Sequence, residues 1–398
     1  MLEHSPSLPL FIDYHLDSDL DTKMIAEAEK GIILALKQRD RVRRVRFLLP
    51  VPITQRLIRI IEEEYPVLEY LIINPSTTLS MTASILSETF QAPRLRHLTL
   101  RGPGLPIGSR LLTTAVGIVT LYLFLGHTSS YIQPHTLLQW LSFMPQLETL
   151  RVDYIVSPLY EVKRQLVHAP AMTHVTFPNL RWFEFQGPKA YVEAVVCRIT
   201  TPRLEKLDIQ LIMELPMSVP GLLQFMNTTE NLRFDSADFE FCKICASAKM
   251  YLRGQPKAFA LSVTVIGFVL DIQVAGLAEI FNSLGQKLST VEYLTLKYKE
   301  LEYNEIEIDR TGWRNLLGSF GNVKTLRVDE ELVEAVSHCL QVDEGDSSPE
   351  LLPELWELSY SAMGNTYGPF KSFIDTRKKA GRPVILICHT PWSATLLS

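Results

Sequence analysis

Pro93-Arg-Leu-Arg-His-Leu-Thr-Leu-Arg-Gly102 holds a pattern that recurs along almost the whole chain. In this pattern an apolar residue is followed by two mostly polar residues, a second apolar residue, one variable residue and a third apolar residue. Close copies are Leu68/Leu71/Ile73, Leu95/Leu98/Leu100, Leu147/Leu150/Val152, Leu180/Phe183/Phe185, Leu204/Leu207/Ile209, Val291/Leu294/Leu296, Val323/Leu326/Val328 and Leu355/Leu358/Tyr360. Looser copies are Val42/Val45/Phe47 and Ile118/Leu121/Leu123.

The spacing of the copies indicates stacked repeats. Their middle apolar residues lie 23 to 33 residues apart, except for one gap of 87 residues between Leu207 and Leu294. That gap equals three ordinary intervals, so two degenerate copies are expected inside it, with Leu232/Phe234 and Leu261/Val263/Val265 as candidates. A period of this size is typical of repeat architectures, and the pattern itself is that of the strand in a leucine-rich repeat.

Strand alternation gives the predicted repeat two faces. Leu98 and Leu100 would point into the core, while His97, Thr99 and Arg101 would point away from it. One unit cannot bury its own apolar edge, so neighbouring units must stack. The predicted fold is therefore an α/β leucine-rich repeat solenoid of about twelve irregular units. A curved parallel sheet would form its concave face and helices its convex face.

The segments around the repeats complete the predicted organisation. Residues 1–40 form a lead-in with alternating apolar residues and then a capping helix, and residues 41–365 form the repeat domain. Within that domain, helical spacing of apolar residues between the strand motifs predicts the outer helices. Residues 235–258 fit the pattern least and are expected to be an irregular insertion. Residues 366–398 are expected to supply a C-terminal helix and a capping strand.

Composition excludes several classes of protein. The chain of 398 residues is 46% hydrophobic, which argues against disorder, and its net charge of −5 gives no basic footprint for nucleic acid or an anionic membrane. The run Arg39-Asp-Arg-Val-Arg-Arg-Val-Arg46 is a local exception. It is interpreted as a strand with solvated outward arginines, Arg44 and Arg46, and a phosphate-binding patch is the alternative.

Cysteine content and apolar runs bear on location. Five cysteines are sparse and odd in number, which does not indicate a secreted disulfide framework. The start of the sequence lacks the basic and apolar regions of a secretory signal. The longest apolar run, residues 259–270, is too short to span a membrane. A cytoplasmic or nuclear monomer is therefore expected.

No motif for catalysis, cofactors or metals stands out. Cys242-Lys-Ile-Cys245 is a single pair without further ligands, whereas a structural zinc site requires four. Phosphate-binding glycine loops and HExxH are absent, and His97, His168 and His174 are scattered. No Ser/His/Asp spacing indicates a hydrolase. The chain is thus predicted to be no enzyme and to bind no cofactor or metal.

What remains is a binding surface on the outward strand positions. Tyrosine, tryptophan and arginine at such positions are the residue types enriched at protein interfaces. The predicted partner-binding residues are Tyr70, His97, Thr99, Arg101, Tyr122, Arg151, Asp153, Trp182, Glu184, Lys206, Asp208, Tyr293, Lys297 and Arg327. Alternatively, these side chains only satisfy one another across strands, as Arg151 and Lys206 could with Glu184 and Asp208.

Seven segments carry a resemblance to a known family. They are residues 41–48, 63–71, 91–100, 136–150, 177–182, 198–207 and 322–328. They are similar to the repeat region of the large F-box protein family of mushroom-forming fungi, over roughly residues 5–385. In that family an N-terminal F-box docks on a Skp-type adaptor of a cullin ubiquitin ligase, and the leucine-rich repeats are taken to recruit substrate.

The resemblance implies a role in recognising proteins. The repeat region would be the substrate receptor of an SCF-type ubiquitin ligase, with a protein substrate on its concave face. The chain departs from the family near its start, because Leu8-Pro9 runs into Leu10-Phe-Ile-Asp-Tyr14 and not into an F-box pattern. A Skp-type adaptor is expected as partner only if an F-box exists. A stand-alone leucine-rich repeat scaffold without a ubiquitin link is the alternative.

Overall fold

The computed structural model describes most of the chain as two compact units, Met1–Glu205 and Lys206–Ser398. The sequence had predicted one continuous repeat domain, and each unit is described by itself below. The described residues are 8–15, 22–75, 86–101, 109–125, 131–154, 174–212, 218–255, 258–299, 310–341, 350–361 and 368–389. His168, one of the scattered histidines, lies outside them.

In the first unit a parallel sheet follows the order of the chain. Its strands are β1 (Leu10–His15), β2 (Val42–Leu48), β3 (Tyr70–Ile73), β4 (His97–Arg101), β5 (Thr120–Phe124), β6 (Thr149–Asp153) and β8 (Trp182–Pro188). Two short strands, β7 (Val175–Thr176) and β9 (Ile199–Thr200), pair separately. The described parts of this unit therefore have the spatial order that stacked repeats predict.

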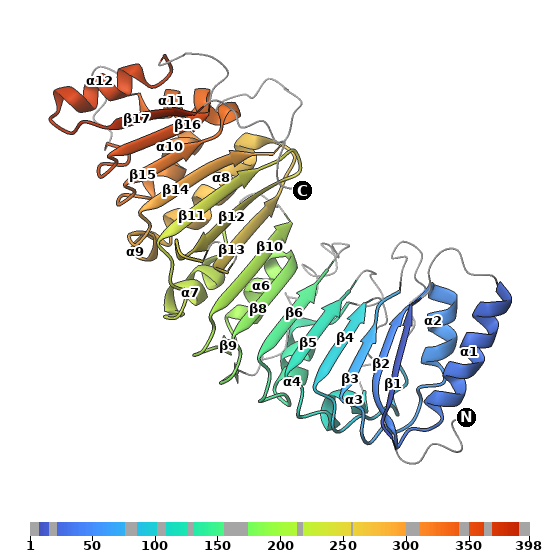
Figure 1. Cartoon of the computed structure of the whole chain (residues 1–398). Coiled ribbons are helices and arrows are strands. Elements are labelled where there is room, and N and C mark those ends of the chain that lie inside the picture. The colour runs from blue at the N-terminus through green and yellow to red at the C-terminus, as the bar shows by residue number, and fades with distance from the viewer. Residues whose placement is uncertain are drawn as a thin grey trace. The chain divides into compact units, whose positions relative to one another are not determined.

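Helices lie along one face of this sheet (Figure 1). They are α1 (Thr22–Leu36), α2 (Val51–Ile58), α3 (Arg110–Thr114), α4 (Pro134–Leu141) and α6 (Lys189–Val196). Proline occupies the first turn of α2 and of α4, where its missing N–H has no helical partner to lose. The opposite face, called the open face below, carries the outward strand side chains.

The register of the strands reproduces the sequence repeat. Val45 pairs with Leu71, Leu71 with Leu98, Leu98 with Leu121, Leu121 with Leu150 and Leu150 with Phe183. Each of these residues is at most 1% exposed. Full burial of such a side chain contributes about 1.5–3 kcal/mol. The middle apolar residues of successive copies thus form one continuous row in the core, as predicted.

The second unit has a mostly parallel sheet with a different connectivity. In space its strands run β10, β13, β12, β11, β14, β15, β16, β17. Their bounds are β10 (Lys206–Ile212), β11 (Ser236–Phe241), β12 (Cys245–Tyr251), β13 (Phe259–Ile266), β14 (Tyr293–Tyr298), β15 (Thr325–Val328), β16 (Glu357–Ser361) and β17 (Ile385–His389). Its helices are α7 (Pro220–Thr228), α8 (Leu270–Asn282), α9 (Gly285–Leu288), α10 (Arg310–Gly318), the 3-10 helix η3 (Glu330–Leu332), α11 (Val333–Leu340) and α12 (Lys371–Lys379).

The expected irregular insertion at 235–258 is instead regular structure, so that prediction was wrong. β11 and β12 form a hairpin, and β12 runs antiparallel to both β11 and β13. The chain passes from β10 to β11, returns through β12 to β13 beside β10, and then continues to β14 beside β11. Ala246 and Ala248 occupy core positions of β12 that leucine occupies in other strands. The leucine pattern therefore did not identify this strand.

The two degenerate copies had different outcomes. Leu261, Val263 and Val265 lie in β13, and Leu261 pairs with Leu207 as an added repeat would require. Leu232 and Phe234 are buried but precede β11 and form no strand. The core position of β11 that pairs with Leu294 is Ala237.

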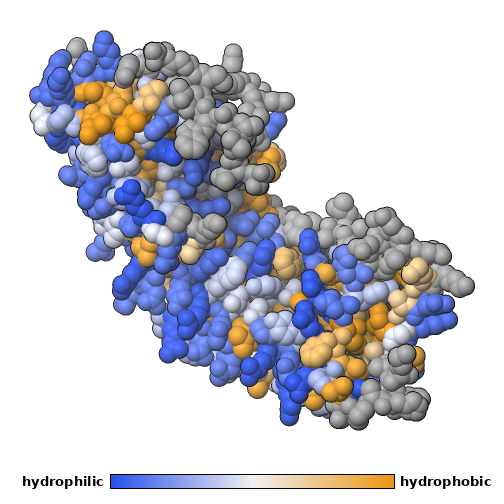
Figure 2. Space-filling model, viewed as in Figure 1, coloured by the Kyte–Doolittle hydropathy of each residue, from blue (hydrophilic) through white to orange (hydrophobic). Residues whose placement is uncertain are grey.

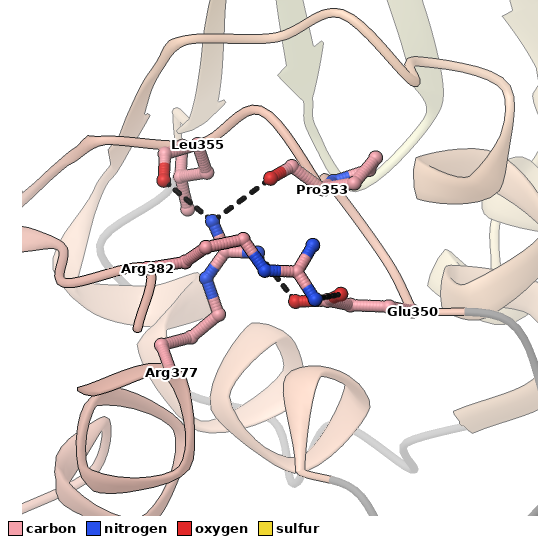
Figure 3. Close-up of polar contacts among 5 residues, drawn as sticks. All are labelled: Glu350, Pro353, Leu355, Arg377 and Arg382. Atoms are coloured by element: carbon pink, nitrogen blue, oxygen red, sulfur yellow. Dashed lines mark hydrogen bonds and ion pairs between the residues drawn. The ribbon is translucent and has the colours of Figure 1, made fainter. Parts of the chain in front are cut away.

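A buried arginine holds the C-terminal helix in place. Arg377 of α12 is 3% exposed. Its guanidinium donates hydrogen bonds to the Glu350 carboxylate and to the carbonyl oxygens of Pro353 at 3.0 Å and Leu355 at 2.7 Å (Figure 3). Arg382 contacts the other Glu350 oxygen at 2.7 Å. These contacts join α12 and the turn before β17 to the segment that leads into β16, where the sequence predicted a helix and a capping strand.

Candidate functional site

The sheet brings the predicted residues of the first unit onto one surface. Strand alternation directs them to the open face, where they form rows across the strands. One row runs through Tyr70, His97, Thr120, Thr149 and Trp182. The next row is Ile72, Thr99, Tyr122, Arg151 and Glu184. In Figure 2, hydrophobic residues gather over β1 to β4 among hydrophilic ones.

Aromatic rings and an arginine stack in the first row. The Tyr70 and His97 rings lie 4.0 Å apart at an angle of 26°, and the Arg44 guanidinium carbon lies 5.5 Å from the centre of the Tyr70 ring. Burial lowers the pKa of His97, and the charge of Arg96 lowers it further. The imidazole is therefore neutral at neutral pH, which suits a stack on a phenol ring.

A second group centres on Phe124, which the sequence prediction missed. Arg101 and Arg151 lie over its ring, with their guanidinium carbons 5.4 Å and 4.8 Å from its centre. Such cation–π contacts hold long arginine side chains against the sheet. Phe124 is two residues after Tyr122 on the same strand, so alternation alone could have identified it.

Arg151 also neutralises two buried carboxylates. Its Nε lies 3.1 Å from Oε1 of Glu184, and one terminal nitrogen lies 3.7 Å from Oδ2 of Asp153. Asp153 and Glu184 are only 6% and 7% exposed. The predicted cross-strand satisfaction of Arg151 by Glu184 is thus confirmed. Because an unpaired buried charge is costly, Arg151 offsets part of the cost of burying these two carboxylates.

Replacing Asp153 with asparagine is expected to change how stability depends on pH. Burial raises the pKa of Asp153 above 3.8, although Arg151 and Arg101 partly offset the shift. A carboxyl whose folded pKa is raised binds its proton more tightly when folded, so it weakens the fold as pH rises between the two pKa values. The melting temperature of Asp153→Asn, measured relative to that of the wild type, should therefore rise from about pH 4 to pH 7.

The exposed Asp375 on α12 supplies the matched control. Asp375→Asn should follow the wild-type melting curve across the same pH range. A constant difference between Asp153→Asn and the wild type, or a difference that shrinks as pH rises, would contradict the assignment of Asp153 as a desolvated carboxyl.

The outward strand positions of the second unit, called its open face, hold the remaining predicted residues in smaller groups. The Lys206 ammonium lies 4.1 Å from the centre of the Phe259 ring. Asp208 pairs in register with Ser262. Tyr293 lies under the Arg253 guanidinium at 3.8 Å. Arg327 is exposed on β15.

Lys297 pairs with a carboxylate that the sequence analysis did not single out. Its Nζ lies 2.6 Å from Oδ2 of Asp238, and the Tyr251 hydroxyl donates to Oδ1 of the same residue at 2.7 Å. Asp238 and Tyr251 belong to the β11–β12 hairpin. They were missed because that segment was expected to be irregular, and strand alternation within it would have been the signal.

No family model and no curated protein matches this chain. The function must therefore be inferred from the surface itself.

Four arginines of the basic run before and within β2 lie near a carboxylate. Arg44 and Arg46 lie 3.7 Å and 3.6 Å from the Asp13 carboxylate, and Arg43 lies 3.8 Å from Glu69. Arg39 contacts Glu63. These pairs favour the interpretation of a strand with solvated arginines over that of a phosphate-binding patch.

The chemistry available to the described residues is limited. They contain no group of three or more His, Cys, Asp or Glu side chains that could hold a metal ion. In the same part of the chain, no helix combines the length and the apolar composition needed to cross a membrane. Many described polar groups of the open faces form cross-strand ion pairs and cation–π contacts.

Proposed function

We propose that the chain is a leucine-rich repeat solenoid that binds another protein on the open, concave face of its sheet without catalysis. The observation that carries this proposal is the set of aromatic and arginine contacts in the first unit, from Arg44, Tyr70 and His97 to the Arg101/Phe124/Arg151 group. Tyrosine, tryptophan and arginine supply most hot spots of protein interfaces.

The rigidity of this surface supports binding of a macromolecule. The side chains stand on paired strands and are already held by stacking and ion pairs, so little conformational entropy is lost when a partner docks. Phe11, which is 65% exposed on β1, adds apolar area at the same face. The combination of an apolar and aromatic centre with charged groups around it is typical of a protein interface.

The more specific form of the proposal is a substrate receptor of an SCF-type ubiquitin ligase, acting in the cytoplasm or nucleus. It is supported by the resemblance of the repeat segments to fungal F-box proteins and by the parallel register of those segments. A stand-alone repeat scaffold would use the same face and lack the Skp-type adaptor.

The proposal predicts that truncating two aromatic residues of the open face abolishes capture of the partner. Wild-type chain and the double variant Tyr122→Ala/Trp182→Ala would be used as baits in lysate, with bound proteins identified by mass spectrometry. A hot-spot residue contributes about 2 kcal/mol or more, which corresponds to a loss of affinity of about thirtyfold per residue. A partner held by the wild type should therefore disappear from the double variant.

Arg59→Ala, in an exposed position just after α2, is the matched control and should keep the partner. Equal capture by the double variant and the wild type would contradict the open face as the binding surface. Recovery of a Skp-type adaptor and cullin with the partner supports the ubiquitin-ligase form. Recovery of the partner alone supports the stand-alone scaffold.

A further inference from the structure

Two reduced thiols face each other at the turn of the β11–β12 hairpin. Cys242 follows β11, Cys245 begins β12, and Lys243 and Ile244 form the turn between them. The Cys242 N–H donates to the Cys245 carbonyl oxygen at 2.8 Å, and the two Sγ atoms lie 3.1 Å apart. Both cysteines are half-buried, and both are free.

The hairpin geometry allows these sulfur atoms to bond. Residues opposite each other in a hydrogen-bonded antiparallel pair have Cα atoms about 5.5 Å apart. Disulfides span Cα separations of roughly 4.4–6.8 Å. Closing the bond therefore requires rotation of two side chains and no movement of either strand out of the sheet.

We propose that Cys242 and Cys245 are a reversible dithiol–disulfide site, oxidised by a small disulfide of the glutathione type. The Cys242 thiolate attacks one sulfur of the oxidant, forms a mixed disulfide and releases one thiolate of the oxidant. Cys245 then loses its proton to solvent, attacks Sγ of Cys242 and displaces the second thiolate. Two protein thiols are oxidised, and one disulfide is reduced to two thiols.

The surroundings of the pair set the order of these steps. Burial, followed by the hydrogen bond and charge of Cys242 and by the charge of Glu240, raises the pKa of Cys245 to about 12. Cys245 therefore remains protonated at neutral pH and acts second. The Lys299 ammonium, which lies 2.6 Å from Oε1 of Glu240, places a positive charge near both sulfur atoms. From α8, Gln273 donates to the Cys242 carbonyl oxygen at 2.8 Å and holds the turn.

The site lies on the same face as the recognition residues of the second unit. Cys245 pairs in register with Ile266, and β11 carries Glu240 and Asp238 toward the open face. A disulfide would tie β11 to β12 at the turn of the hairpin, next to Phe241 and Ala246 in the register. Oxidation of the site goes beyond the proposed binding function and does not depend on it.

The test uses the full reduced chain in glutathione buffers with an increasing oxidised fraction. After acid quenching, free thiols are alkylated under denaturing conditions, and peptides are identified by mass spectrometry. The expected product is a peptide that contains the Cys242–Cys245 disulfide. The buried Cys339, whose pKa burial raises to about 12, should stay free and be alkylated.

Single variants separate the two roles. In Cys245→Ser, Cys242 should accumulate as the mixed disulfide with glutathione, because no second thiol resolves it. In Cys242→Ser, Cys245 should react more slowly than Cys242 does in Cys245→Ser, because burial still raises the pKa of the Cys245 thiol and only a thiolate attacks. The wild-type measurement stands even if a variant folds poorly.

Three outcomes would overturn the proposal. The first is that Cys242 and Cys245 each carry a separate glutathione adduct in the wild type. The second is that both stay free under conditions that modify the exposed Cys197 and Cys388. The third is that Cys245→Ser leaves Cys242 unmodified while circular dichroism shows a native fold.

Discussion

Leu98→Asp is expected to unfold the first unit. Leu98 is fully buried and lies between Leu71 and Leu121 in the central core row of the sheet. The substitution removes about 1.5–3 kcal/mol of burial and places a carboxylate between the buried Leu71 and Leu121. The combined loss should exceed about 4 kcal/mol, against the 5–15 kcal/mol that typically stabilises a domain.

The neighbouring residue on the same strand provides the control. Thr99 points to the open face between Ile72 and Tyr122, so Thr99→Asp keeps its carboxylate at the surface. Its free energy of unfolding should differ from that of the wild type by less than about 1 kcal/mol. Urea unfolding followed by circular dichroism distinguishes the two variants, and a Leu98→Asp variant as stable as Thr99→Asp would refute the register of β4.

The regular part of the fold could be predicted because large apolar residues occupy the repeated core positions. Where leucine or phenylalanine occupies the middle position, as in Leu121 and Phe183, the predicted pairing is the observed pairing. In β11 the middle position is Ala237, which is equally buried. Alanine does not match the pattern of large apolar residues, so this strand was not recognised. Topology adds to the difficulty, since no local pattern indicates that β13 returns to pair with β10.

The candidate site was also predicted only in part. Arg151 and Glu184 occupy equivalent outward positions in successive copies of the strand motif. Because successive strands pair in register, the two side chains lie opposite each other and are in contact. The Asp238–Lys297 pair was not predicted, because its partners are 59 residues apart and β11 was not recognised as a strand. The burial of Asp153 and Glu184 could not be predicted either. The sequence shows that these side chains carry a charge, but not that the folded chain shields them from water.

The second large effect is expected at Arg377, which the sequence did not single out. Its guanidinium is the only described donor that joins Glu350 to the carbonyl oxygens of Pro353 and Leu355 (Figure 3). Arg377→Ala leaves the carbonyl oxygens of Pro353 and Leu355 without that donor, while Glu350 keeps its contact with Arg382. A buried acceptor that loses its donor costs about 1–3 kcal/mol. The second unit should therefore unfold at a lower urea concentration.

Arg377→Lys tests whether geometry or charge matters. A lysine ammonium is a point charge and cannot reproduce the planar fork that reaches a carboxylate and two carbonyl oxygens together, so this variant should recover little of the lost stability. Lys378→Ala, exposed on the same helix, should unfold like the wild type.

Hydrogen exchange should locate the effect of Arg377→Ala. Relative to the wild type, amide exchange in this variant should speed up more in α12 and β17 than in β14 and β15. The reason is that the contacts of Arg377 join α12 to the end of the sheet that β16 and β17 form. If exchange in α12 and β17 stayed at the wild-type rate, the cap would depend on apolar contacts such as Tyr360 with Phe370, whose ring centres are 5.4 Å apart, and not on the arginine.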